Sequence, residues 1–311
     1  MVRYLINRVL WTIPVLWLVA TVTFFLMHTA PGGPWDARSG AAGRSLDPSL
    51  EASFNRQYGL DEPLIVQYFT YLKNAATLNF GDSFVQQGQS VIEVIGNGFP
   101  YSARIGVLAL LMALGIGIPV GILAAVKHNT MTDYASLFVT TISYTLPDFV
   151  IAIFLLIVFS VHLDLVPILF TDWRSYILPA FALGTGSAAF IARLTRSSVL
   201  EAMRHDHVVT ARAKGLSSRA VISRHVVRNG MIPVITIIGP AFAGLVTGKI
   251  IIERMFGIPG MGRLFIDSIS TRDYPVIMGV TLFYSFFIIL GNLMVDVAYV
   301  FADPRIRDSQ G

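Results

Sequence analysis

Few residues of this chain have the types and spacing that catalysis requires. A phosphate-binding loop follows the pattern GxxxxGK with Ser or Thr next, and the nearest string, GLVTGKI at residues 244–250, has different glycine spacing and ends in Ile. The sequence also contains no HExxH, no GxSxG and no paired carboxylates. We therefore predict that the chain is not an enzyme and does not hydrolyse ATP itself.

The residues that usually hold metals or cofactors are also sparse. The chain has no cysteine, which excludes disulfides, thiolate nucleophiles and iron–sulfur ligation. Its six histidines are scattered, and His205 and His207 are two residues apart, which places them on different faces of a helix. We expect polar surface histidines, no metal site and no cofactor bound by this chain.

Two acidic residues interrupt otherwise uncharged stretches. Asp148 follows the helix-breaking Pro147, where it can cap the next helical segment or line a polar pathway. Asp296 lies in the last apolar stretch, where an arginine of a neighbouring helix can pair with it. Ionisable groups are costly in lipid, so both are intramembrane polar candidates.

The elements that carry these residues can be predicted from the composition. The chain is 54% hydrophobic and only 14% charged, against roughly 25% charged residues in soluble proteins. A helix needs about 20 apolar residues to cross a membrane. We predict an all-α polytopic membrane protein in a single membrane domain. Its six predicted transmembrane helices cover residues 9–27, 105–126, 134–161, 175–192, 229–248 and 274–301. The third is long enough for one crossing with a kink at Pro147, but not for two.

Basic residues set the predicted orientation. Residues 193–228 carry eight basic and two acidic side chains, and cytoplasmic loops of membrane proteins are enriched in Lys and Arg. We therefore place this loop and both termini in the cytoplasm. Residues 28–104 then form an extracytoplasmic segment, too polar for the bilayer. In it we expect one helix capped by Asp61 and a shorter one that ends at Gly59. The segment serves mainly as a structural lid, or docks a soluble partner.

The cytoplasmic loop is longer than a plain connector requires. Val209, Ala213 and Leu216 recur at helical spacing, small residues lie among them, and Gly215 ends the pattern. This composition predicts a short amphipathic helix that rests on anionic lipid or contacts a protein partner.

Several strings resemble one family. TARAKGL followed by SRHVVRNGMIPVIT is similar to the cytoplasmic coupling loop of membrane subunits of binding-protein-dependent ABC importers, in the peptide and nickel branch. RYLINRVLWTIPVL, APGGPW, YGLDEPLIVQYFTYL with NFGDSF, GIPGMG with RDYPVIMG, and DPRIR agree with it along nearly the whole chain. The likeness is greater to the B-type than to the C-type subunit of oligopeptide and dipeptide permeases. It implies the type I ABC importer permease fold.

The resemblance also implies which residues act. In the family, the matching segment is the coupling helix that docks on a separate ATPase subunit. The implied contact residues are Asp206, Val209, Thr210, Ala211, Arg212, Ala213, Lys214, Gly215 and Leu216. Val209-Thr210-Ala211 stands where the wider importer pattern has Glu-Ala-Ala, while Gly215 is kept; His225 replaces Ile, and Val227-Arg228 replaces Leu-Pro.

The implied function is alternating-access transport of peptides across a prokaryotic plasma (inner) membrane. The implied partners are a second permease subunit, two ATPase subunits that use ATP and magnesium, and an extracytoplasmic binding protein; no nucleic acid is involved. The cargo stays open among oligopeptides, dipeptides, nickel chelates and glutathione. Two other classes of protein are the alternatives. A membrane enzyme needs a cluster of polar residues near a membrane boundary, which the sequence does not show. An ion-coupled transporter working alone needs more charged residues at the membrane midplane and broken helices in matching halves, and the sequence shows neither.

Overall fold

The computed structural model describes residues 2–35 and 47–302, with side chains for 6–35 and 47–294. The chain is helical, with one isolated β-bridge between Asp82 and Ser90 in the described part. It divides into two compact units. The first contains residues 102–258 and 290–302, and the second contains residues 2–101 and 259–289 within the described ranges. The long helices α5 (Val91–Val126) and α15 (Tyr274–Ala302) contribute to both units.

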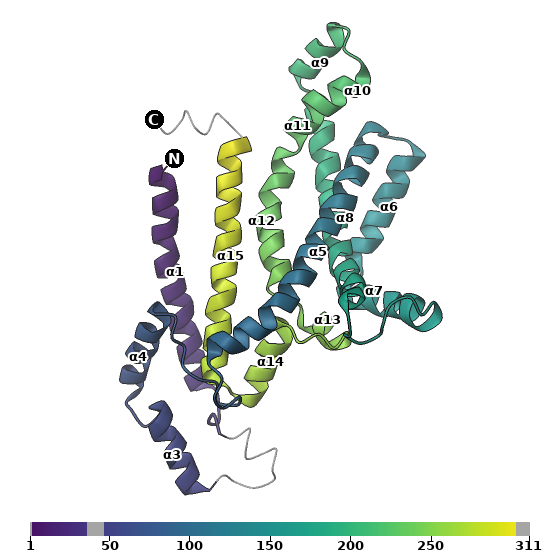
Figure 1. Cartoon of the computed structure of the whole chain (residues 1–311). Helices are drawn as coiled ribbons and strands as arrows, with labels where there is room; N and C mark the ends of the chain where they lie inside the picture. Colours follow the sequence, from purple (N-terminus) through teal and green to yellow (C-terminus); the bar gives the residue numbers. More distant parts are fainter. Residues whose placement is uncertain (1, 36–46, 303–311) are drawn as a thin grey trace. The chain divides into compact units, whose positions relative to one another are not determined.

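In the first unit the central helix is α8 (Ile177–Ala202), preceded by the 3₁₀ turn η2 (Trp173–Tyr176). Helices α6 (Met131–Thr145) and α7 (Asp148–Leu155) pack against it, and the π-helix η1 (Leu156–His162) continues α7. The rest of the unit is α9 (Asp206–Ala213), α10 (Ser218–Val221), η3 (Ile222–Val226), α11 (Val227–Gly230), α12 (Ile232–Val246) and α13 (Ile250–Met255). Figure 1 shows α9 and α10 at one end of this unit.

Small residues bring α5 and α8 unusually close. A Cβ atom at Gly121 would lie 2.5 Å from the carbonyl oxygen of Ala192, and one at Gly117 would lie 2.7 Å from that of Ala188. Neither glycine has positive φ, so each is required here by the space and not by the backbone conformation. The tight contact makes the α5–α8 pair a rigid base for the loop that begins at the end of α8.

Two breaks interrupt the helices expected to span the membrane. The helix segments on either side of Pro147 meet at 102°, and Ser218–Gly230 meets Ile232–Val246 at 50°. Pro147 lacks an amide hydrogen, and Leu146 before it is extended, so α6 cannot continue. We expected a kink at Pro147 and no broken helices; the bend there is much sharper than a kink, and the second break was not expected. Among residues 2–35 and 47–302, four helices are long and apolar enough to cross a membrane, or up to six if each bent pair is one span.

The second unit contains α1 (Val2–Thr29), α3 (Pro48–Tyr58), α4 (Leu64–Ala76) and α14 (Met261–Thr271), besides its parts of α5 and α15. Asp47 accepts a hydrogen bond from the backbone of Ser49 at the start of α3, and Gly59 ends the helix in the left-handed conformation. Helix α4 begins after Pro63 without a side-chain cap, so the expected cap by Asp61 is wrong. Aromatic side chains of α4 pack on α1, with Tyr68 and Tyr71 beside Phe24.

Candidate functional site: the loop around α9

The segment predicted to contact a partner forms α9 and the turn after it. Helix α8 continues to Ala202, ten residues beyond the span end expected from the sequence, and a short turn leads directly into α9. After α9 the chain turns at Gly215 and enters α10, which continues through η3 and α11 toward α12. Figure 1 shows α9 and α10 projecting beyond the ends of α8 and α11, so the loop is presented outward from its unit.

One face of α9 is buried in its own unit. Val208 is fully buried and Ala211 nearly so. They form an apolar cluster with Val199 and Ala202 of α8 and Ala125 of α5, joined by Val221 and Val226 from the segment after α9. Because these contacts come from the ends of two long helices, a displacement of α9 must also move the ends of α5 and α8.

The other face of α9 is open. Val209 is 60% exposed and Leu216 is 43% exposed, although both are apolar. The residues implied as contacts by the family resemblance are exposed with the single exception of Ala211. They include Asp206, Thr210, Arg212, Ala213 and Lys214. The predicted apolar stripe of Val209, Ala213 and Leu216 therefore faces away from the chain, and the buried stripe is the one through Val208 and Ala211.

Gly215 makes the turn that ends this surface. Its φ is +79°, a conformation that costs an L-residue with a side chain about 1–2 kcal/mol. The Gly215 amide donates to the carbonyl of Arg212 at the end of α9, and the Leu216 amide donates to that of Ala211. Ser217 then caps α10 by accepting from the amide of Ala220 at 3.4 Å. Leu216 is thereby held beside α9, so that the turn and the helix form one surface.

The two histidines of the loop lie side by side, so the prediction that they occupy different helix faces is wrong, because His205 precedes the helix. His205 precedes α9 and its ring stacks on that of His207, with centroids 5.6 Å apart. Nε2 of His207 lies 3.1 Å from the side-chain nitrogen of Asn229. No group of three potential metal ligands occurs among residues 2–35 and 47–302.

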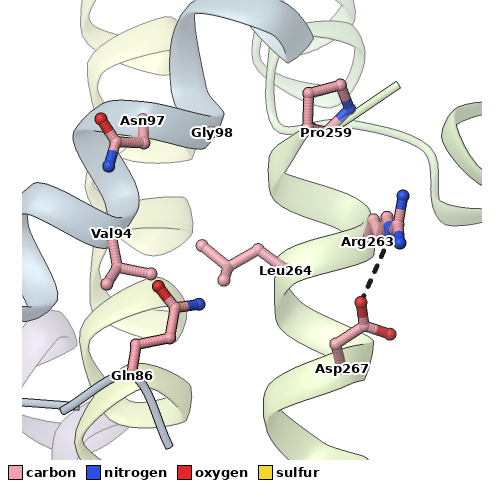
Figure 2. A pocket seen from close by; sticks show the side chains of 9 residues that line it. Gln86, Val94, Asn97, Gly98, Pro259, Arg263, Leu264 and Asp267 are labelled. Carbon is pink, nitrogen blue, oxygen red and sulfur yellow. Dashed lines mark hydrogen bonds and ion pairs between the residues drawn. The ribbon is translucent and has the colours of Figure 1, made fainter. Parts of the chain in front are cut away.

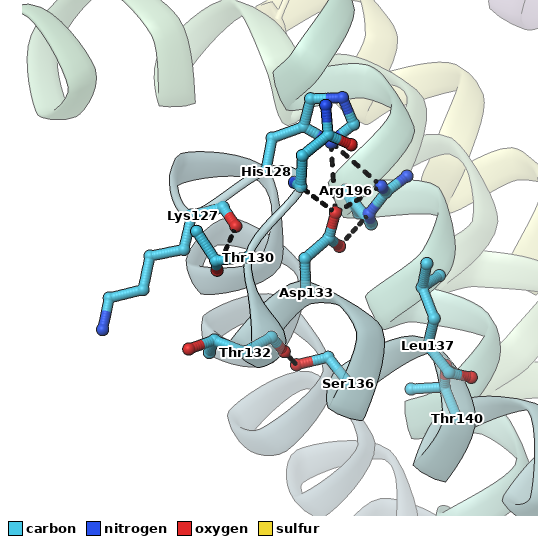
Figure 3. Close-up of polar contacts among 10 residues, drawn as sticks. Lys127, His128, Thr130, Thr132, Asp133, Ser136, Leu137, Thr140 and Arg196 are labelled. Carbon is cyan, nitrogen blue, oxygen red and sulfur yellow. Dashed lines mark hydrogen bonds and ion pairs between the residues drawn. The ribbon is translucent and has the colours of Figure 1, made fainter.

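A buried ion pair joins the C-terminal part of α8 to the start of α6, as Figure 3 shows. Arg196 of α8 donates from Nε and Nη2 to the two carboxylate oxygens of Asp133 at 2.6 and 2.8 Å. The Asp133 side chain is 1% exposed, and it also accepts from the Asn129 amide and contacts His128 Nδ1 at 3.1 Å. Two hydrogen bonds in this fork geometry fix α8 against the start of α6.

Comparison with known proteins identifies the architecture. The family model for the binding-protein-dependent transport system inner membrane component matches residues 117–308, and the model for its N-terminal part matches residues 1–113. The chain belongs to this family. The dipeptide transport system permease protein DppB of Bacillus subtilis (strain 168) is 41% identical over 310 residues, which cover 99% of this chain and 98% of that protein. The oligopeptide transport system permease protein OppB of Haemophilus influenzae is 37% identical over 312 residues, 99% of this chain and 100% of that protein.

A solved structure agrees with the fold. A chain of an amino acid ABC transporter crystallised with histidines superposes with a TM-score of 0.54 at 14% identity, covering 67% of this chain and 94% of that one. The chain thus has the type I ABC importer permease fold that its sequence predicted. The resemblance carried by short motifs is confirmed by matches that cover both ends of the chain.

The two intramembrane acidic candidates have different outcomes. Asp148 is the first residue of α7, but its side chain makes no capping hydrogen bond, so the predicted cap is wrong. A carboxylate oxygen of Asp148 faces α8 at Gly186, where a Cβ atom would lie 3.5 Å away. Its role on a polar pathway stays a prediction. Asp296 belongs to α15, and its side chain lies outside the described ones, as do the basic residues after position 302.

Besides the Asp133–Arg196 pair, two further buried polar pairs were missed by the sequence analysis. Ser102 of α5 donates to Glu253 of α13 at 2.6 Å, and both side chains are buried in the first unit. In the second unit Ser83 donates to Asp273, which follows α14. Glu253 and Asp273 fall between the fifth and sixth predicted spans, and no local pattern marks them as buried. Their partners are 151 and 190 residues away in the sequence.

Proposed function

We propose that this chain is the B-type permease subunit of an ATP-driven importer of peptides, and that α9 is its coupling helix. The observation that carries the proposal is the two-faced environment of α9. Val208 and Ala211 fasten it to the ends of α5 and α8, while Val209 and its exposed neighbours face outward. A helix that is fixed on its inner face and presents apolar and charged side chains on its outer face is suited to receive movement from a partner and pass it to the membrane helices.

The mechanism that fits this arrangement is alternating access. Closure of an ATPase pair would bring the coupling helices together, and the packing of α9 on α5 and α8 would carry that displacement into the bundle. The Asp133–Arg196 pair would make α6 follow α8 as one body. Because packed helices are bistable and do not deform continuously, a small movement of α9 can select one of two arrangements.

The assembly and location follow from the same proposal. The chain would pair with a second permease subunit, bind two ATPase subunits that use ATP and magnesium, and receive cargo from an extracytoplasmic binding protein. The α9 loop and both termini would lie in the cytoplasm, as the eight basic residues of positions 193–228 favour. We infer peptide cargo because the relatives over the full length are named as dipeptide and oligopeptide permeases.

A pair of adjacent valines provides the test. The chain has no native cysteine, so Val209→Cys and Val208→Cys each create a single reactive position in this subunit. Val209 is exposed and Val208 is fully buried. In the purified complex, a benzophenone maleimide attached to the new thiol of Val209→Cys should cross-link this subunit to an ATPase subunit, as detected by mass spectrometry. The thiol of Val208→Cys should react slowly and give no such product.

The outcome that overturns the proposal is equally clear. If the Val209→Cys variant labels fully and forms adducts only with lipid, α9 rests on the membrane surface and is not the coupling helix. If the complex contains no ATPase subunit at all, the importer assignment itself fails. Labelling at Lys73→Cys, an exposed position on α4, controls for nonspecific cross-linking.

A further inference from the structure

Helix α4 presents an apolar face that the described part of its unit leaves exposed. Ile65 is 58% exposed and Phe69 is 62% exposed. The opposite side of the helix packs on α1 through Tyr68 and Tyr71, and Figure 1 shows α4 beside the C-terminal part of α1. The only charged residue of α4 is Lys73, near its end. A lid helix that faced water would have polar residues on its outer face, which α4 lacks at these positions.

Another exposed surface of the same unit has the polar character that α4 lacks. Figure 2 shows a cavity of about 230 Å³ between the start of α5 and α14, lined in part by Arg263 and Asp267. These two side chains form an ion pair and are each nearly half exposed. Because exposed charges are costly in lipid, this surface of α14 faces water. The outer face of α4 therefore has a different environment from that of α14.

The contacts of α4 lie well inside the apolar span of α1. The hydroxyls of Tyr68 and Thr21 are 2.8 Å apart, and the rings of Tyr68 and Tyr71 both lie against that of Phe24. The candidate span of α1 ends at Thr29. At 1.5 Å per residue, Phe24 is about 7 Å and Thr21 about 12 Å from that end. The side chains of α4 thus reach below the end of the span.

Helix α15 gives the same depth independently. Met278 and Leu282 pack against the cluster that α4 forms with α1. The candidate span of α15 begins at Tyr274. The two residues are therefore about 6 and 12 Å inside the span. A soluble partner that docks outside the lipid headgroups does not reach this depth, so the contacts favour lipid as the neighbour of α4.

The sequence of α4 divides its surface into three sides, because successive helical residues are turned by about 100°. Tyr68 and Tyr71 lie on the side that packs on α1. The polar side consists of Gln67, Thr70 and Asn74. Between these two sides lie Ile65 and Phe69, one turn apart. One side packed on protein, one apolar and exposed, and one polar are what a helix at a membrane surface requires.

The apolar side of α4 continues the exposed surface of α1. Only 11% of the apolar window of α1 is buried. Phe25 of α1 is nearly half exposed, and its ring centroid is 5.6 Å from that of Tyr68. The Tyr68 centroid is in turn 5.4 Å from that of Phe69. Lipid that covers Phe25 therefore meets Phe69 across an aromatic surface.

We propose that α4 is an interfacial helix that lies in the surface of the bilayer, with Ile65 and Phe69 among the lipid acyl chains. Helices of this kind bury their apolar face about 5–10 Å into the boundary of headgroups and acyl chains, which agrees with the depth of the contacts to α1 and α15. The flexible stem of Lys73 lets its ammonium reach the lipid phosphates. In the proposed orientation this is the extracytoplasmic leaflet, so residues 28–104 do not lie wholly outside the bilayer.

The test measures the depth of α4 in the whole complex, reconstituted in nanodiscs of phosphatidylcholine and phosphatidylglycerol. A nitroxide label is attached to Phe69→Cys or to Thr70→Cys, which are adjacent and both exposed. This chain has no native cysteine, so the labelled wild-type complex supplies the background signal of its partners. Power saturation compares collisions with oxygen, which concentrates in lipid, and with a nickel chelate, which stays in water. The ratio of oxygen to nickel collisions should be several-fold higher at Phe69→Cys than at Thr70→Cys.

Two further positions keep the measurement decisive. Ile65→Cys lies on the same side as Phe69 and should repeat its result, even if the label at Phe69 disturbs local packing. Gln57→Cys, an exposed position on α3, calibrates a label in water.

The inference is overturned if labels at Ile65→Cys and Phe69→Cys collide with the nickel chelate as often as the label at Thr70→Cys. High nickel accessibility that falls only after addition of the loaded binding protein also overturns it, because the apolar face then docks that protein. The measurement involves neither cargo transport nor ATP hydrolysis, so its failure leaves the proposed function untouched.

Discussion

The loop around α9 and the loop before α5 are held in place by opposite means. The first is fastened by apolar packing, with Val208 and Ala211 inserted among side chains of α5 and α8. The second is fastened by one buried carboxylate, Asp273, which binds the loop at Ser83 and the two following amides. Both loops are thereby kept on their supporting helices, although neither forms long regular structure.

The difference gives the two loops different freedom to move. Apolar packing has little directional preference, so α9 and the ends of α5 and α8 can move together without losing their contact. Hydrogen bonds to a carboxylate lose strength steeply when their geometry changes, so the loop at Ser83 keeps one position. A moving part and a fixed loop require these two kinds of attachment.

The largest effect is expected from a charge on the inner face of α9. Val208→Asp places an unpaired carboxylate in a fully apolar cluster and should cost about 4 kcal/mol of local stability. Amide hydrogen exchange should show lost protection in residues 199–226, with the loop at 83–90 unchanged. Val209→Asp, one residue away on the exposed face, should leave exchange nearly as in the wild type. Equal loss from both variants would contradict the two-faced environment of α9.

The next largest effect is expected from loss of the ion pair between Asp133 and Arg196. Asp133→Asn removes the carboxylate that Arg196 holds with two hydrogen bonds and should cost about 3 kcal/mol. Thermal unfolding of the purified complex measures the loss. In a double-mutant cycle with Arg196→Gln, the second substitution should add little, because the pair is already broken. Full additivity of the two losses would show that the ion pair does not fasten α8 to α6.

A smaller loss of stability is expected when the hydrogen bonds that Asp273 accepts are weakened. Asp273→Asn keeps the shape but replaces a charged acceptor with a neutral one, at a cost of about 2 kcal/mol. Hydrogen exchange should rise at the amides of Phe84 and Val85 and remain unchanged in α9. Ser83→Ala removes one donor and should produce about half of that effect. Increased exchange in α9 would mean that the two attachments are not independent.

The smallest effect separates backbone strain from packing. Gly215→Ala forces a side chain into positive φ at +79° and should cost about 1 kcal/mol, although no atom lies within 4 Å of the new Cβ. Gly59 ends α3 in the same left-handed conformation, and the space around it is equally open. Gly59→Ala should therefore cost the same. Thermal unfolding compares the two. A much larger loss at Gly215 would indicate a contact in the assembled complex that the isolated subunit lacks.

Local sequence signals predicted the elements better than their arrangement. The apolar stretches located the long helices, Gly59 marked the end of α3, and Pro147 marked a kink. The 102° bend was not predicted, because proline only removes a hydrogen bond, and packing of α7 against α8 sets the angle. Motifs spread along the chain were sufficient for the family, which the full-length relatives confirm.

The sequence predicted a short amphipathic helix in this loop, but not which of its residues pack against their own unit. Periodicity marked Val209, Ala213 and Leu216 as the stripe that contacts lipid or a partner, and these residues are exposed, whereas the buried positions Val208 and Ala211 were not predicted. A helix of eight residues has two comparable apolar stripes, and the choice between them depends on α5 and α8, which are distant in the sequence. The Asp133–Arg196 pair escaped for the same reason, since 63 residues separate its partners.

The most direct test of the central claim measures coupling in the complete importer. ATP hydrolysis is recorded with and without binding protein loaded with peptide, for the wild type and for Val209→Glu, which places a charge on the exposed face of α9. The proposed coupling predicts that the variant folds as the wild type does, shown by unchanged hydrogen exchange, but loses the peptide-dependent rise in hydrolysis and imports no peptide. Hydrolysis and import at wild-type levels in this variant would contradict the assignment of α9 as the coupling helix.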